Sequence, residues 1–301
     1  MALTRPMTVL VTLADDDRWL VRLLRFGAFA CLAGWAWQHL YWEGPYGPLF
    51  WRGEALDFVA HHGGDWDDFV GQTPGAGAVQ RWIAWMAWPY VICAALTITA
   101  RPRAWLQFSG LAVGGLCLAA LAYSKYLTAA RELPMLVEHA AQVASPVLLA
   151  LALACGAKHR AVIAATTGAV IMTFAAHGAY ALGWWPTPAS FYAMATVVLG
   201  TDEATTTAIL RSAGALDLLI CVGLLAPRLR RGCMLYAATW GLLTALARPV
   251  AGMSLDLRFW GADQFLYEAM VRAPHFTLPL YLALIWRRPL ARGDQPEPAA
   301  A

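Results

Sequence analysis

The feature that most constrains this fold is a series of eight apolar runs separated by short polar segments. The runs cover roughly residues 20–40, 82–100, 104–124, 142–157, 161–183, 209–227, 232–248 and 274–287. A helix that crosses a bilayer needs about 20 largely apolar residues. None of the runs alternates apolar and polar residues as the strands of a membrane barrel do. We therefore expect an all-α membrane protein with about eight transmembrane helices.

Composition supports this fold class. Only 14% of the 301 residues are charged and 59% are hydrophobic, whereas soluble domains carry about 25% charged residues. Too few charges remain to cover a water-facing surface, so the expected partner is the lipid bilayer. The net charge of +3 is too small to suggest a nucleic-acid partner. None of the six cysteines forms a CxxC pair, which argues against a thiol-redox centre.

The basic residues predict an orientation. With the N-terminus in the cytoplasm, the inner segments carry 14 Lys and Arg residues and the outer segments carry 8. The inner loops are also short and the outer loops long. Cytoplasmic loops are enriched in Lys and Arg, so we expect a protein of the bacterial inner membrane with both termini in the cytoplasm.

The two halves of the chain share a plan. His39 and His177 each end a first helix, and a turn with Pro45 or Pro186 follows. Further along, three pairs occupy matching places: Arg81 with Arg211, Lys125 with Arg248, and Glu138 with Glu268. We therefore expect two parallel-repeat four-helix bundles. The predicted parts are a cytoplasmic N-terminal tail (1–19), a first unit (20–157), a second unit (161–288) and a cytoplasmic C-terminal tail (289–301).

In this topology most polar residues lie at the outer ends of helices, and Asp217 lies deeper, within an apolar run. Charge at membrane depth is costly and is a default sign of function. The main candidates are His177, Asp217 and Arg211, with His39, Lys125, Arg248, Trp184 and Trp185 as ligand-binding candidates. Structural roles compete with these: histidines cap helices, basic side chains reach the interface, and tryptophans form interfacial belts. No metal-binding motif stands out.

The second half resembles the DoxX-like membrane family, a group similar to DoxD and MauE proteins and more remotely to the vitamin K-dependent carboxylase group. The resemblance rests on a helix ending in HG, a Pro-containing turn, and R-x-x-G-x-x-(D/E) on the next helix. Here these are His177-Gly178, Pro186, Pro188 and Phe191, then Arg211, Gly214 and Asp217. The first half departs from the pattern, with Leu40 in place of the glycine and Ala87 in place of the acid.

The resemblance implies four-helix units associated with membrane redox chemistry, such as passing thiosulfate electrons to quinone or maturing periplasmic redox proteins. We therefore expect a quinone or another small lipid-soluble ligand near the extracytoplasmic face. His177 would hydrogen-bond a quinone oxygen, and Asp217 with Arg211 would handle the proton. The alternatives are a membrane partner or assembly factor for a periplasmic enzyme, a partner of another membrane redox protein, a small-solute transporter, and a haem held by His39 and His177. Whether the chain is an enzyme stays open.

Overall fold

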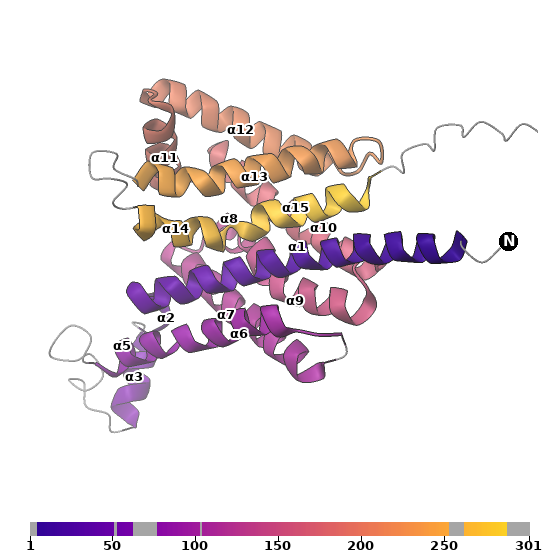
Figure 1. Cartoon of the computed structure of the whole chain (residues 1–301). Helices are drawn as coiled ribbons and strands as arrows, with labels where there is room; N and C mark the ends of the chain where they lie inside the picture. The colour runs from indigo at the N-terminus through magenta and orange to yellow at the C-terminus, as the bar shows by residue number, and fades with distance from the viewer. Residues whose placement is uncertain (1–4, 51–52, 63–76, 103, 253–261, 288–301) are drawn as a thin grey trace, which may run out of the picture.

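The computed structural model describes residues 5–50, 53–62, 77–102, 104–252 and 262–287, and all regular structure in these ranges is helical. Most of the long helices run roughly parallel, in one bundle (Figure 1). In chain order the helices are α1 (Arg5–Tyr41), α2 (Gly47–Phe50), α3 (Gly53–His61), α5 (Ala78–Trp85), α6 (Ala87–Thr99), α7 (Trp105–Thr128), α8 (Leu133–Val137), α9 (Ala140–Cys155), α10 (Arg160–Ala181), α11 (Ala189–Leu199), α12 (Glu203–Gly223), α13 (Arg230–Gly252), α14 (Ala262–Val271) and α15 (Ala273–Ile285).

Each predicted apolar run is helical over most of its length, with its ends shifted by a few residues. The largest difference is at the N-terminus, where α1 begins at Arg5 within the segment 1–19 that we expected to be a tail. The predicted C-terminal tail (289–301) lies outside the described residues.

Six segments are long and apolar enough to cross a membrane: Asp17–Tyr41, Val79–Thr99, Trp105–Thr128, Leu133–Cys155, Arg160–Ala181 and Glu203–Gly223. They indicate an integral membrane protein. The last two predicted runs are not among the six. Helix α13 contains Arg230, Arg231 and Arg248, which lower its hydropathy, and α15 has only 13 residues.

The helices contact one another as two rings. In the first ring α1 contacts α6, α6 contacts α7, α7 contacts α9, and α9 contacts α1. In the second ring α10 contacts α12, α12 contacts α13, α13 contacts α15, and α15 contacts α10. Helices α9 and α15 also contact each other, and α1 contacts both α14 and α15, so the two rings share a packed interface.

Small residues allow this close packing. Helices in a membrane associate through van der Waals contact and close backbone approach rather than through the hydrophobic effect. The core accordingly contains many alanines, among them Ala28, Ala169, Ala237 and Ala283. A Cβ on Gly241 of α13 would collide with the carbonyl of His275 on α15.

Local signals set helix boundaries near the second ring. Gly200 ends α11 with φ 64°, a left-handed conformation that glycine adopts without strain. Asp202 then begins α12, because its carboxylate accepts a 2.8 Å hydrogen bond from the Thr205 N–H. This backbone hydrogen bond also lowers the pKa of the Asp202 carboxyl below its usual value.

Candidate functional site

Buried polar side chains gather at one end of the bundle, between the two rings. Helices α1, α7, α10, α13 and α14 bring residues of their C-terminal parts to this end, α9 and α15 bring residues at or near their N-termini, and Glu138 follows α8. The side chains are Trp35, Lys125, Glu138, His139, Gln142, His177, Arg248, Glu268, Arg272 and His275. The set divides into a buried network around Glu138 and an adjoining cavity.

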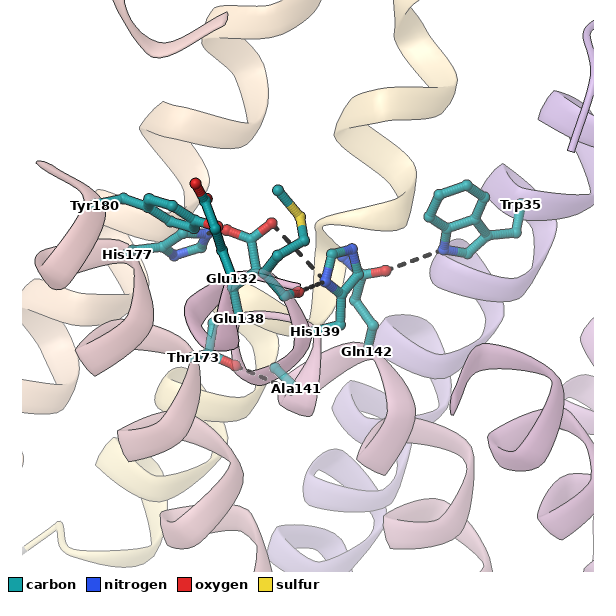
Figure 2. Close-up of polar contacts among 10 residues, drawn as sticks. Trp35, Glu132, Glu138, His139, Ala141, Gln142, Thr173, His177 and Tyr180 are labelled. Atoms are coloured by element: carbon teal, nitrogen blue, oxygen red, sulfur yellow. Dashed lines mark hydrogen bonds and ion pairs between the residues drawn. The ribbon is translucent and has the colours of Figure 1, made fainter. Parts of the chain in front are cut away.

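Glu138 is at the centre of the network (Figure 2). Its Oε2 lies 3.3 Å from Nε2 of His177, and its Oε1 lies 3.8 Å from Nδ1 of His139. Neither contact has hydrogen-bond geometry, so both are electrostatic. His139 Nδ1 is also 2.7 Å from the Met135 carbonyl oxygen, to which it donates as an N–H. On its other side, His177 faces the ring of His275, with the two centroids 5.4 Å apart.

Two hydrogen bonds tie α10 to this network. The Tyr180 hydroxyl donates to Oε2 of Glu132 over 2.8 Å, and the Thr173 hydroxyl accepts a 3.0 Å bond from the Ala141 N–H (Figure 2). Among the described residues, no group of three or more His, Cys, Asp or Glu side chains is arranged to hold a metal ion. The Glu138–His177 contact and the Tyr180–Glu132 hydrogen bond thus join the two rings through a polar network.

The cavity lies beside the network and measures about 210 Å³. Its wall includes Trp35, Lys125, Gln142, Arg248, Glu268 and Arg272. The indole N–H of Trp35 donates to Oε1 of Gln142 over 3.0 Å. Lys125 Nζ lies over the same indole, 5.1 Å from its centroid, close enough for a cation–π interaction. The wall thus combines a flat aromatic face with several cationic donors.

One cation in the wall has a carboxylate partner. Arg248 donates to Oε2 of Glu268 over 2.7 Å, joining α13 to α14. The Nε of Arg248 is buried and has no hydrogen-bond partner. Among the described residues, the side chains of Lys125 and Arg272 make no hydrogen bond or ion pair.

The three main sequence candidates are not joined to one another. His177 belongs to the Glu138 network. Asp217 of α12 is only 4% exposed, and its Oδ1 has no hydrogen-bond partner. Arg211 is exposed on the same helix. Within the described ranges, no hydrogen bond or ion pair links any two of the three.

His39 occupies an aromatic pocket inside the first ring. Its ring centroid lies 5.4 Å from that of Tyr46 and 4.8 Å from that of Tyr90. Nδ1 donates to the Trp35 carbonyl oxygen over 2.6 Å, and Nε2 is buried without a partner. His39 and His177 therefore have separate surroundings, which do not fit a haem held between them.

The two ligand-binding tryptophan candidates lie on the surface. Trp184 is 64% exposed and Trp185 is 36% exposed. They follow α10 after Gly183, whose φ of 79° turns the chain, and neither lines the cavity. Their exposure is typical of tryptophans that lie at the membrane interface, which was the alternative to a ligand-binding role.

Sequence reasoning found Lys125 and Arg248 but missed several residues of the cavity wall, among them Trp35, Gln142 and Arg272. Trp35 and Gln142 lie within apolar runs, and Arg272 fell in a segment that we assigned to an outer loop. Arg272 instead separates α14 from α15 and faces the cavity. A glutamine inside an apolar run was the available signal, because a buried amide requires partners.

Comparison with known proteins adds nothing to this description, since no family model, no curated protein and no solved structure matches the chain. The DoxX-like resemblance therefore rests on the quoted residues alone.

Proposed function

We propose that the chain is an integral membrane protein with eight spans, arranged as two DoxX-like four-helix units. The pattern of contacts supports this, because the ring α1–α6–α7–α9 corresponds in order to the ring α10–α12–α13–α15. Contacts between the rings correspond as well: α1–α15 matches α10–α9, and α1–α14 matches α10–α8. A parallel repeat about an axis along the membrane normal has this property.

The two helix segments outside the six long apolar spans also suit a membrane. Helix α13 exposes Leu235, Leu242, Leu243, Leu246 and Val250, a surface compatible with lipid. Helices α14 and α15 follow each other with only Arg272 between them, so together they supply an eighth crossing. Arg248 and Arg272 line the internal cavity rather than the lipid-facing surface, as the cost of charge in lipid requires.

The proposed location is the bacterial inner membrane, with both termini in the cytoplasm. Helix α1 begins and α15 ends at the same end of the bundle (Figure 1). The basic turn 228–231 and Lys158 lie between helices at the end of the bundle opposite the cavity. The positive-inside rule then directs the cavity to the extracytoplasmic face.

We infer that the cavity receives the head group of a small lipid-soluble redox ligand, for which a quinone is the best candidate. The cavity wall is the observation that carries this proposal, because Lys125 lies over the ring of Trp35 and Arg272 lines the same cavity. Quinone carbonyls accept hydrogen bonds, and a ring can lie against an indole. The volume of about 210 Å³ is below the ~300–1,000 Å³ of sites for drug-sized ligands, so only a head group would enter.

This proposal gives the ligand contacts to Lys125 and Arg272, of which Lys125 is a residue predicted from sequence, and leaves the predicted residue Arg248 in the cavity wall. A bound quinone would supply the capacity to accept electrons and protons. The role of the chain is to bind and orient the head group and to exclude water. His177 would act indirectly, because it holds Glu138 beside the cavity.

A reduced-minus-oxidised ultraviolet difference spectrum of the detergent-purified protein tests the proposal. We expect a quinone-type change that is lost in Lys125→Met and retained in Lys158→Met, the matched lysine at the opposite end of the bundle. A flat spectrum after the protein has been supplied with quinone would contradict the quinone assignment. A quinone-type spectral change that persists in Lys125→Met would show that the quinone does not bind in this cavity.

One observation favours a second function, that of a membrane partner for a periplasmic or membrane redox protein. Aromatic side chains are exposed at the end of the bundle that contains the cavity, including Tyr41, Trp42 and Trp184. Aromatic residues are enriched in protein interfaces. Copurification that is lost when these three residues are changed to serine, with the quinone spectrum unchanged, would support this function.

A further inference from the structure

The cavity wall contains several cationic hydrogen-bond donors, Lys125, Arg248 and Arg272. The side chains of Lys125 and Arg272 make no hydrogen bond to any described residue, and Nε of Arg248 is buried without a partner. Gln142 uses its Oε1 to accept from Trp35, which leaves its amide N–H groups as further donors at the wall. The carboxylate of Glu268 is already engaged by Arg248. A ligand that accepts hydrogen bonds is needed to satisfy this wall.

The charges around the cavity also leave an imbalance. The cations are Lys125, Arg248 and Arg272, and all three line the cavity. The carboxylates are Glu268, in the wall, and Glu138, which acts on both Lys125 and Arg272 through electrostatic interaction. These three cations and two carboxylates alone leave one excess positive charge around the cavity. An uncompensated cation between packed helices is unfavourable, so one negative charge is missing.

The geometry points to an anion. We propose that the cavity binds one singly charged carboxylate or oxyanion group, carried on a ligand no larger than a single ring. Lys125, Arg272 and the Gln142 amide would hold the charged oxygens, and Trp35 would cover the rest of the ligand. The inference rests on the ligand cavity proposed above and defines the charge of what enters it. Both the head group of a membrane ligand and a free small anion offer this chemistry.

Benzoate and benzamide separate charge from shape, because they have nearly the same size and differ in one negative charge. Calorimetric titration of each into the full-length protein in detergent should give binding of benzoate roughly 10- to 100-fold tighter than that of benzamide, as for a charge-assisted hydrogen bond. Lys125→Met and Arg272→Met should each remove this preference. Lys158→Met, at the opposite end of the bundle, should retain it.

The variant Glu268→Gln tests whether the charged residues of the cavity wall bind an anion or only stabilise the fold. Removing this carboxylate frees Arg248 and adds one positive charge to the cavity, so benzoate should bind more tightly. A merely structural pair would give unchanged or weaker binding after its disruption. If Arg272→Met does not fold, the other two variants still test the proposal, because Lys125→Met should weaken benzoate binding and Glu268→Gln should strengthen it.

Equal affinity for benzoate and benzamide, or no binding of benzoate at millimolar concentration, would overturn the anion proposal. The quinone proposal is judged separately by the difference spectrum. Benzoate binding without any quinone signal would keep the anion site and reject the quinone. A quinone carries a charged oxygen only after it is reduced and deprotonated, so benzoate that displaces bound quinone would place both in the same cavity and favour the head group of a membrane ligand. Quinone that stays bound beside benzoate would identify a free small anion as the occupant.

Discussion

Gly178 of α10 and Gly214 of α12 face each other at a close approach of these two helices. A Cβ on Gly178 would lie 2.9 Å from the carbonyl oxygen of Gly214, and a Cβ on Gly214 would lie 2.8 Å from the carbonyl oxygen of Gly178. Both glycines belong to the motif that carries the DoxX-like resemblance. The motif therefore has a packing explanation, because paired glycines allow two backbones to touch.

Replacing either glycine with a larger residue should separate α10 from α12. We expect Gly214→Val to lower the free energy of unfolding by about 1–3 kcal/mol, as overpacking does elsewhere. The matched control is Gly168→Ala on α10, since a Cβ at Gly168 meets nothing within 4 Å. That control should be neutral or slightly stabilising, because alanine favours helix more than glycine does. Thermal unfolding in detergent measures both, and equal effects of the two variants would contradict the close crossing.

The hydroxyl of Tyr180 provides a second, smaller test of the polar network. Tyr180→Phe removes the hydrogen bond to Glu132, which joins α10 to the turn before α8. Because a typical net hydrogen bond contributes about 0.5–1.5 kcal/mol, we expect a loss in this range. Tyr41→Phe is the control, since Tyr41 is 73% exposed and its hydroxyl makes no hydrogen bond to a described residue. A neutral Tyr180→Phe would mean that water replaces the bond.

Much of the fold could be predicted because the bilayer imposes a simple rule. A segment in lipid must satisfy its backbone internally, so each apolar run had to be a helix, and each is helical over most of its length. The rule says less about interruptions. The helices break at Met86, after α8 and at Arg272, and of these the break at Arg272 has a local signal, because Pro274 lies in the first turn of α15.

The candidate site was only partly accessible from the sequence, for a related reason. Lys125 and Arg248 were recognisable because charge near an apolar run is costly. Lys125 and Arg248 line one cavity because of how α7, α13 and α14 pack against one another. The number of residues between them in the sequence does not specify this packing. Arg211 and Asp217 share a helix and a motif, yet one is exposed and the other buried. The six-residue spacing turns the two side chains toward different surroundings.

The buried carboxyl of Asp217 should weaken the fold. A buried polar group without a hydrogen-bond partner costs about 1–3 kcal/mol, so Asp217→Leu should raise the free energy of unfolding by an amount in this range. Glu203→Leu, at an exposed position on α12, should change it by less than about 0.5 kcal/mol. Thermal unfolding measures both variants. Destabilisation by Asp217→Leu would mean that the carboxyl has a favourable partner, such as a bound ligand.

A stabilised Asp217→Leu protein would then test function directly. Functional sites often retain groups that the fold alone would reject. If Asp217 handles a proton for the ligand, the variant should be more stable and should lose the pH dependence of the quinone difference spectrum. Unchanged pH dependence would remove Asp217 from the proposed proton chemistry.

The orientation in the membrane can be tested with a native cysteine. Cys155 is exposed at the end of α9, beside the basic turn before α10, and the other five cysteines are buried or half-buried. We expect an impermeant maleimide to leave Cys155 unlabelled in intact spheroplasts and to label it in opened membranes, because that turn is on the cytoplasmic side. The control is Trp184→Cys in a Cys155→Ser background, at an exposed position near the opposite end of α10. It should be labelled in both preparations. The reverse pattern would invert the topology and open the cavity to the cytoplasm, and the charged ligand would then be drawn from the cell interior.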